Sequence, residues 1–343
     1  MLQSCLLCET VSLELTARVL VLNSATDPFV PFAINQVRAG TITLAEDNIT
    51  TAQQFLRAPH VRHVAFHDYI VHSLTPTMDV AVMNLLYQPG KQWVRYGIEV
   101  AARSLRSGGQ LYVVGAKDRG ILSTAKEMQA RFGNVETLTI SKGQRVVRSR
   151  KTSETPAHDT VEENLALSLF AGGKLDEGTR LLLEALQVRT TDEALDIGSG
   201  AGYIGLHIAR LATKGQVTMV DASLAAVEAA RLAVQESGLS NVRVLSSDGA
   251  QAVLAQRFDL VASNPPFHLG GVQTTAIAER FIRESAQVLR PRGRLYLVAN
   301  RFLKYEQTIQ EAFNNVSEVS GDSRYKVLYA EKRLERDEDT LFF

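Results

Sequence analysis

The sequence contains one pattern of apolar runs and turns twice, at a separation that drifts from about 175 to about 184 residues. Short loop insertions in one copy would make the separation drift in this way. Since 343 residues exceed what one core usually accommodates, the repeat predicts two tandem copies of one fold. The matched segments, first copy then second, are residues 18–23 and 193–198, 43–46 and 218–221, 78–87 and 258–267, and 107–114 and 291–298.

Short apolar runs alternate with helical patterns through the second copy. This alternation favours an α/β fold in which a mostly parallel sheet is covered by helices on both faces, as in Rossmann-like domains. The repeat predicts the same architecture for the first copy. The expected strands are residues 194–197, 216–220, 242–245, 258–263 and 294–299, and the expected helices are residues 203–211, 224–237 and 276–289.

A polar segment without helical or strand period separates the copies. It contains Pro156 and predicts a linker over residues 151–163. The expected domains are therefore residues 1–150, a degenerate copy expected to bind the substrate, and residues 164–343, the copy that carries the site.

The composition is that of an ordinary globular protein, with 45% hydrophobic and 22% charged residues. No apolar run is long enough to cross a bilayer and the N-terminus lacks a signal-like segment, so we expect a cytoplasmic protein without a membrane partner. The formal net charge is zero, but residues 1–150 carry 16 Lys and Arg against 11 Asp and Glu, whereas residues 151–343 carry 21 against 26. This asymmetry can orient a polyanion.

The positive charge of the first copy is concentrated near the linker. The cluster predicts an RNA-binding surface formed by Lys142, Arg145 and Arg148, and a solvated edge strand is the alternative of equal weight. Its members are Lys142, Arg145, Arg148, Arg150 and Lys151.

Two groups of residues raise the question of a metal or redox site. A C-x-x-C spacing without a second pair favours two reduced thiols. Histidines on a strand and the following loop do not converge on one point, so we expect surface or packing histidines and no metal. The residues are Cys5 and Cys8, and His60, His63, His67 and His72.

The tetrapeptide Asn264-Pro265-Pro266-Phe267 follows a predicted strand and has the chemistry of an amine clamp. An Asn side chain offers one carbonyl acceptor, and prolines leave neighbouring peptide carbonyls free to accept. Phe267 offers a flat face for stacking. A planar group that carries an NH2 suits such a site, whereas the structural alternative is a strand end terminated by prolines.

Glycines and acids follow the three strands before this clamp. Gly198, Gly200 and Gly202 open a helix after the first strand and allow a ligand close to the backbone. A dinucleotide loop would have the same glycines, but a dehydrogenase would need no amine clamp. The acids suit three parts of one cofactor: Asp196 a ligand ammonium, Asp221 ribose hydroxyls, and Asp248 an exocyclic adenine amine.

This ordered set, over residues 165–335, resembles the class I S-adenosylmethionine-dependent methyltransferases. The resemblance implies S-adenosylmethionine as cofactor, bound by the three acids, the glycines and Asn264, with Asn264, Pro265 and Phe267 as catalytic residues. Within that family the clamp is typical of enzymes that methylate N6 of adenine, N2 of guanine or the side-chain amide of glutamine.

Residues 170–179 narrow the choice of amine. They resemble the F-x-x-x-x-L-D-x-G-[TS] segment of the ribosomal RNA guanine-N2 methyltransferases, as do His268 and a duplicated architecture with a degenerate first copy. Residues 269–271, Leu-Gly-Gly, depart from the commoner polar continuation. The resemblance implies an enzyme acting on 16S rather than 23S RNA, with the 30S subunit as the favoured partner. We expect the protein to be a monomer. An adenine-N6 or glutamine-N5 methyltransferase and a noncatalytic RNA-binding module are the alternatives.

The first copy lacks the residues of the site. Residues 23–28, Asn-Ser-Ala-Thr-Asp-Pro, replace the glycine loop, and residues 84–87, Asn-Leu-Leu-Tyr, replace the clamp. We expect the first copy to keep the fold without the activity.

Overall fold

The computed structural model describes residues 2–55, 57–58, 60–72, 75–153, 155, 175–266, 268–269, 272–273 and 275–333. The chain divides into two compact units, Met1–Ala171 and Gly172–Phe343. Only four residues of the predicted linker, 151–153 and 155, are described, so its bounds remain a prediction.

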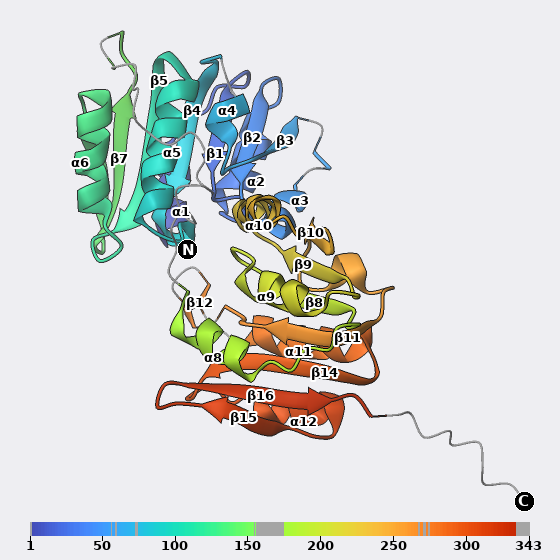
Figure 1. The fold of residues 1–343 in the computed structure, drawn as a ribbon. Coiled ribbons are helices and arrows are strands. Elements are labelled where there is room, and N and C mark those ends of the chain that lie inside the picture. Colours follow the sequence, from blue (N-terminus) through green and yellow to red (C-terminus); the bar gives the residue numbers. More distant parts are fainter. Residues whose placement is uncertain are drawn as a thin grey trace, which may run out of the picture. The chain divides into compact units, whose positions relative to one another are not determined.

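The N-terminal unit begins with a helix and then alternates strands and helices (Figure 1). Its elements are α1 Leu2–Thr10, β1 Arg18–Leu22, α2 Phe29–Gln36, β2 Thr41–Glu46, α3 Ile49–Gln53, β3 Val61–Ala65, α4 Tyr69–His72, β4 Met78–Asn84, η1 Leu85–Tyr87, α5 Lys91–Ser104, β5 Leu105–Ala116, α6 Ile121–Phe132, β6 Glu136–Ser141 and β7 Gln144–Arg150.

The C-terminal unit repeats this order. Its elements are α8 Glu177–Ala185, β8 Ala194–Ile197, α9 Tyr203–Leu211, β9 Val217–Asp221, α10 Leu224–Ser237, β10 Val242–Ser246, η2 Gln251–Val253, β11 Phe258–Ser263, β12 His268–Leu269, β13 Val272–Gln273, α11 Ala276–Val288, β14 Leu289–Asn300, α12 Glu306–Phe313, β15 Ser317–Gly321 and β16 Tyr325–Glu331.

The two seven-stranded sheets have the same topology. Their strand orders are β3-β2-β1-β4-β5-β7-β6 and β10-β9-β8-β11-β14-β16-β15. Five strands of each are parallel, and a final hairpin is antiparallel. Even the register shifts recur, at Met78/Val80 and at Phe258/Leu260. The predicted fold class, two tandem Rossmann-like domains, is confirmed.

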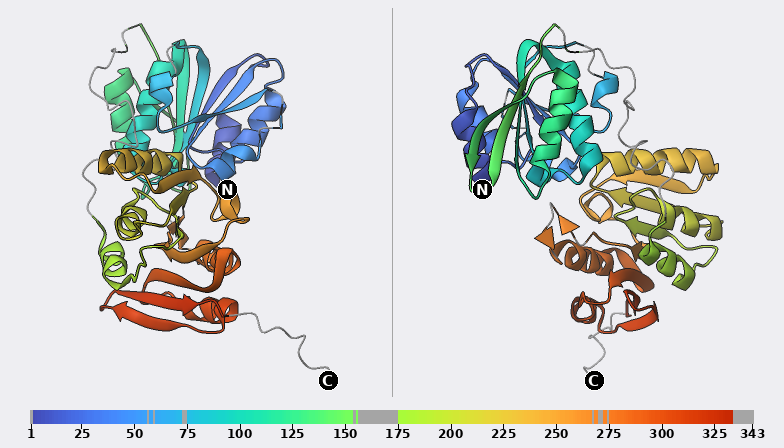
Figure 2. Two further views of the ribbon diagram at one scale, coloured as in Figure 1. Left: turned by 45° about the vertical axis from the view of Figure 1, so that its right-hand side comes forward. Right: turned by 90° about the vertical axis from the view of Figure 1, so that its left-hand side faces the viewer.

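Helices cover both faces of each sheet (Figure 2). In the C-terminal unit α8 and α9 pack on one face through Leu182 and Ile208, and α11 and α12 pack on the other through Ile282 and Ile309. Residues that alternate along the central strands supply the two cores, so both faces of β8 and β11 are buried.

The β15–β16 hairpin was not among the predicted strands. β16 pairs with β14 over seven residue pairs and extends the sheet in the antiparallel direction. β14 itself begins at Leu289, five residues before the expected start at residue 294. The polar and glycine-containing start of β14 hides its strand character, because the pairing of Leu289 with Phe258 of β11, rather than local propensity, sets where the strand begins.

Candidate active site

The candidate site lies at one edge of the C-terminal sheet, where parallel strands end together. β8 is the third strand of the order, with β9 on one side and β11 on the other. Strand order reverses at β8, and ligands of open α/β sheets bind at the carboxyl ends of strands beside such a switch point. The fold brings the predicted residues Asp196, Asp221 and Asn264 to this edge.

Asp196 is fully buried in β8 and has an incomplete set of partners. Its Oδ2 accepts a hydrogen bond from the Gly205 amide at 2.9 Å, while Oδ1 is buried without a partner among the described residues. Burial raises the pKa of Asp196 to about 7, the Gly205 amide opposes that rise, and the Asp221 charge adds to it. A ligand ammonium would satisfy Oδ1 and stabilise the ionised carboxylate, so the residue fits the predicted role.

The glycine loop joins β8 to α9 in a conformation that L side chains rarely adopt. Gly198, Gly200 and Gly202 have φ angles of +75°, +54° and +85°. A Cβ atom on Gly198 or Gly202 would lie 3.3 Å from a side-chain atom of the core, whereas one on Gly200 would meet nothing within 4 Å. The backbone at Gly200 therefore borders open space, which a ligand can approach closely.

Asp221 ends β9 and holds this loop in place. Its Oδ2 accepts from the Gly200 amide and its Oδ1 from the Ser223 amide, each at 2.9 Å. Burial raises the pKa of this carboxyl, and the amides oppose the rise. Each oxygen retains a lone pair, which suits the predicted contact with ribose hydroxyls.

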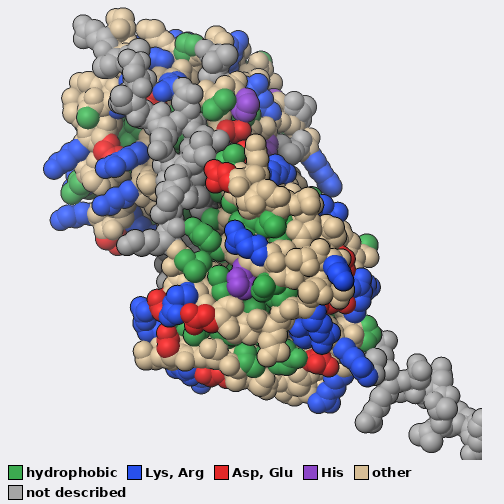
Figure 3. Space-filling model, in the orientation of Figure 1, with side chains coloured by type: hydrophobic (Ala, Val, Ile, Leu, Met, Phe, Trp, Pro, Cys, Tyr) green, Lys and Arg blue, Asp and Glu red, His purple; other side chains and the backbone are tan. Residues whose placement is uncertain are grey.

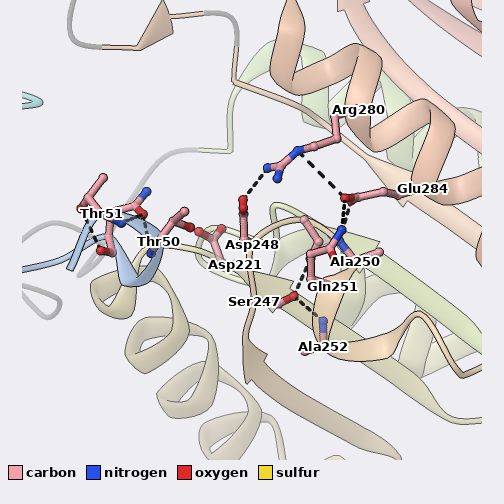
Figure 4. Close-up of polar contacts among 12 residues, drawn as sticks. Thr50, Thr51, Asp221, Ser247, Asp248, Ala250, Gln251, Ala252, Arg280 and Glu284 are labelled. Atoms are coloured by element: carbon pink, nitrogen blue, oxygen red, sulfur yellow. Dashed lines mark hydrogen bonds and ion pairs between the residues drawn. The ribbon is translucent and has the colours of Figure 1, made fainter. Parts of the chain in front are cut away.

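Asp248 follows β10 and is engaged by a residue that the sequence did not reveal (Figure 4). Arg280, in the first turns of α11, donates from Nη2 to Asp248 Oδ1. Glu284, one turn further along α11, is buried and accepts from the Ala250 amide and from Gln251 Nε2, both at 2.7 Å. The turn after β10 is thereby tied to the helix that follows the clamp, and the role of Asp248 with adenine remains a prediction.

The clamp lines a cavity of about 370 Å³ at the ends of β11 and β14. Pro265 is buried there and Asn264 is half-buried, whereas Phe267 lies outside the described residues. Asn264 Nδ2 donates to Thr179 Oγ1 at 2.8 Å and to the carboxylate of Asp176 at 3.2 and 3.3 Å. The lining residues are Asp176, Asn264, Pro265, Pro266, Val298, Ala299, Asn300, Leu303, Tyr305 and Tyr325.

Asp176 and Thr179 belong to the segment that carries the resemblance to guanine-N2 enzymes, but sequence reasoning assigned them no place in the site. Their helix α8 packs on β14, which brings them to an asparagine 85 to 88 residues later in the chain. The motif over residues 170–179 was the signal in the sequence that could have pointed to these two residues. The contact could not be inferred, because it depends on how α8 packs on the sheet.

In the N-terminal unit, side chains of the unit itself bond to one another and to the backbone at the ends of β1 and β4. Asn84 accepts from the Leu86 amide at 2.9 Å and donates to Asp27 Oδ2 at 2.6 Å. Gln88 Nε2 donates to the carbonyls of Leu22 and Asn23 at 3.2 and 3.1 Å. The glycines and prolines are replaced by residues that bond to one another, which explains physically why this copy keeps the fold without the cofactor loop.

The three predicted RNA-binding residues do not share one face of the sheet. Lys142 lies in the turn before β7 with a φ angle of 45°, and Arg145 and Arg148 follow on that strand. Residues an odd number of positions apart on a regular strand point to opposite faces, so these two arginines diverge. Arg148 is also paired with Glu136 at 2.6 Å.

The histidines and cysteines are placed separately. His63 Nε2 lies 2.8 Å from the Glu46 carbonyl oxygen, whereas His67 and His72 approach Asp68 Oδ2 at 3.9 and 3.1 Å. Cys5 and Cys8 are free thiols on α1, one exposed and one half-buried. None of the described helices combines the length and apolar character needed to span a membrane.

Comparison with known proteins identifies both units. Residues 9–142 match the family described as Methyltransferase small domain N-terminal, and residues 164–329 match Methyltransferase small domain. The chain is 30% identical over 311 residues to the Ribosomal RNA small subunit methyltransferase C of Shewanella loihica, covering 84% of this chain and 90% of the relative. It is 34% identical over 263 residues to the protein of that name from Shewanella halifaxensis, covering 71% and 75%.

Among solved structures, a similar one is the T. thermophilus 16S rRNA N2 G1207 methyltransferase in complex with AdoMet and guanosine. Its TM-score is 0.83 at 28% identity, over 97% of this chain and 92% of that one. The resemblance inferred from the motifs is confirmed. The chain belongs to the ribosomal RNA small subunit methyltransferase C family, within the class I S-adenosylmethionine-dependent methyltransferases.

Proposed function

We propose that the protein transfers a methyl group from S-adenosylmethionine to the exocyclic N2 amine of a guanine in 16S ribosomal RNA. The observation that carries this proposal is the cavity lined by Asn264 and Pro265, directly after β11. The neighbouring strand, β8, carries the buried Asp196 carboxylate, one oxygen of which has no partner among the described residues. The cavity suits an NH2 group, and the Asp196 oxygen suits an ammonium. The similar solved structure is a complex with AdoMet and guanosine, which supports assigning the two features to cofactor and substrate.

The cofactor, when bound, supplies an electrophilic methyl group on a sulfonium. The residues of this chain would orient the nucleophile, since the lone pair of a guanine amine is delocalised into its ring. Asn264 Oδ1 and the Pro265 carbonyl would accept the two N2 hydrogens and direct the lone pair at the methyl carbon. The C–S bond breaks as the N–C bond forms, and one N2 proton then leaves to water. Positioning of this kind supplies much of the rate enhancement in a displacement.

The target base must leave its helix to enter the cavity, because the amine is inaccessible in stacked RNA. Phe267 is the proposed stacking surface. The N-terminal unit is proposed to hold the RNA, with Lys142, Arg145 and Arg148 as contacts to phosphates. On the face shown in Figure 3, the described Lys and Arg side chains stand among Asp and Glu, so RNA contact would rest on local groups of cations.

The 30S subunit is the favoured substrate particle, and the activity is proposed for the cytoplasm, where ribosomal RNA is found. A monomeric enzyme remains a prediction that sedimentation analysis checks.

Incubation of the protein with labelled cofactor and naked RNA, 30S or 50S particles, followed by nucleoside analysis, tests the substrate. We expect N2-methylguanosine from 16S RNA, whereas N6-methyladenosine, or label in protein, would contradict the proposal.

Replacement of the clamp asparagine tests the site itself. We expect Asn264→Ala to lower kcat by about 100-fold, because the amine loses one of its two orienting acceptors. Calorimetry measures cofactor affinity separately, because Asn264 is also among the residues expected to bind the cofactor. Asn84→Ala, the same change in the degenerate copy, is the matched control and should leave kcat unaltered at a temperature where both variants are folded. An unchanged kcat for Asn264→Ala would exclude the clamp.

A further inference from the structure

Three side chains form a closed hydrogen-bonded triangle at the edge of the cavity. Asp176 Oδ2 accepts from the Thr179 hydroxyl at 2.5 Å. Thr179 Oγ1 in turn accepts from Asn264 Nδ2 at 2.8 Å, and the same Nδ2 lies 3.2 and 3.3 Å from the two oxygens of Asp176. Thr179 is buried, so its bond to Asn264 is shielded from water.

We propose that Asp176 and Thr179 are positioning residues for methyl transfer, which fix the Asn264 amide with its oxygen toward the substrate amine. The proposal rests on the proposed function. A carboxylate only accepts hydrogen bonds, so the amide group that faces Asp176 must be the NH2. Rotation of the amide by 180° would set Oδ1 against the Asp176 carboxylate, and Oδ1 could then bond to Thr179 only if the hydroxyl gave up its own bond to Asp176.

The fixed orientation decides what the clamp can bind. Oδ1 points away from Nδ2 and accepts no hydrogen bond from the described residues, in an asparagine that lines the cavity with Pro265. With Oδ1 presented, the cavity offers an acceptor to an amine hydrogen. With the amide reversed, it would offer N–H groups to an amine that also carries hydrogens, and the substrate would lose its orientation.

Asp176 has a second role that an experiment must separate from this one. It is the N-cap of α8, where its Oδ1 accepts from the Thr179 amide at 3.0 Å. Asn is as good an N-cap residue as Asp, so Asp176→Asn keeps the cap while it removes one acceptor from the triangle. Thr179→Val removes the hydroxyl at nearly constant volume, and Thr179→Ser keeps the hydroxyl.

The experiment measures kcat and KM for the RNA substrate, cofactor affinity and the melting temperature of the full-length protein. We expect Asp176→Asn and Thr179→Val to lower kcat by about tenfold or more, because a misoriented Asn264 amide slows methyl transfer without weakening the binding of RNA. Cofactor affinity should stay within about twofold, and Thr179→Ser should retain most of kcat. In the Asn264→Ala background, Asp176→Asn should cause no further loss, because the group it orients is gone.

An equal loss in both backgrounds would overturn the proposal, since it would show that Asp176 acts independently of Asn264. An unchanged kcat in both Asp176→Asn and Thr179→Val would also overturn it. Failure of the proposed function is distinguishable, because the wild-type protein would then yield a product other than N2-methylguanosine. The coupling between Asp176 and Asn264 would in that case be measured from the rate at which that product forms.

Discussion

The aspartates of the site differ because their surroundings differ, although each follows or ends a strand at the same sheet edge. Asp196 is fully buried and one of its oxygens has no partner among the described residues, whereas Asp248 is half-buried and bonded to Arg280. Burial without a cation raises a carboxyl pKa, because it disfavours the charged form. Burial raises the pKa of both Asp196 and Asp221, but only Asp196 has a buried oxygen without a partner among the described residues, so we expect pH to act on ammonium binding through Asp196.

At residue scale we predict that cofactor affinity depends on the ionisation of Asp196. Its pKa is raised from 3.8 to about 7, so the unliganded folded state holds a proton that the unfolded state releases, and its stability falls as pH rises from about 4 to about 7. An ammonium requires the ionised form. Affinity should therefore rise by up to about tenfold per pH unit between about pH 5.5 and 7, then level off.

Calorimetric titration of S-adenosylmethionine across this pH range measures the effect. Asp196→Asn is the matched control, because it keeps the shape of the side chain and removes the titration. Its binding should be weak and nearly independent of pH. A pH dependence of the same size in this variant would assign the titration to another group.

Among the elements, the turns at the ends of strands and helices restrict the choice of residue most, because some of their positions need a positive φ angle. Gly200 and Gly238 both have positive φ angles, +54° and +67°, and a Cβ atom on either would meet nothing within 4 Å. Gly200 lies in the loop between β8 and α9, whereas Gly238 ends α10. The same substitution therefore imposes the same kind of backbone strain at both positions, but only one of them borders the site.

We predict that Gly200→Ala and Gly238→Ala each cost about 1 kcal/mol of unfolding free energy, because Ala disfavours positive φ. Only Gly200→Ala should weaken cofactor binding, by about tenfold or more, since its methyl group occupies space that the ligand needs. Denaturant unfolding and calorimetry measure the two effects. Equal cofactor affinity in the two variants would show that the ligand does not approach Gly200.

For the whole molecule, the two units have sheets of the same strand order, and the residues of the predicted site lie in the C-terminal unit. In the N-terminal unit Gln88, Asp27 and Asn84 bond to one another or to the backbone at the end of β1 and in the loop after it. These bonds stand where the C-terminal unit has its glycine loop, and the surface of the N-terminal unit can serve another role. The proposed use is binding of RNA.

We predict that the basic residues of β7 and the turn before it contribute unequally to RNA affinity. Arg148 is engaged by Glu136 and points to the face opposite Arg145, so Lys142→Ala with Arg145→Ala should account for most of the effect of removing all three. The slope of log affinity against log salt should fall by about 0.7 to 0.9 for each phosphate that is no longer neutralised. Filter binding at several salt concentrations measures it. An unchanged slope in the triple variant would exclude this surface.

The sequence alone determined the fold class, the duplication and the ends of strands that carry Asp196, Asp221 and Asn264. These features depend on periodicity and on local turn chemistry, which are written in consecutive residues. The tertiary structure decided the rest: the buried Asp196 oxygen that no described residue contacts, the Arg280 contact to Asp248, the divergence of Arg145 from Arg148, and the triangle around Asn264. Each joins residues far apart in the chain or depends on burial or strand pairing, and only the packing of strands and helices into the sheet fixes these.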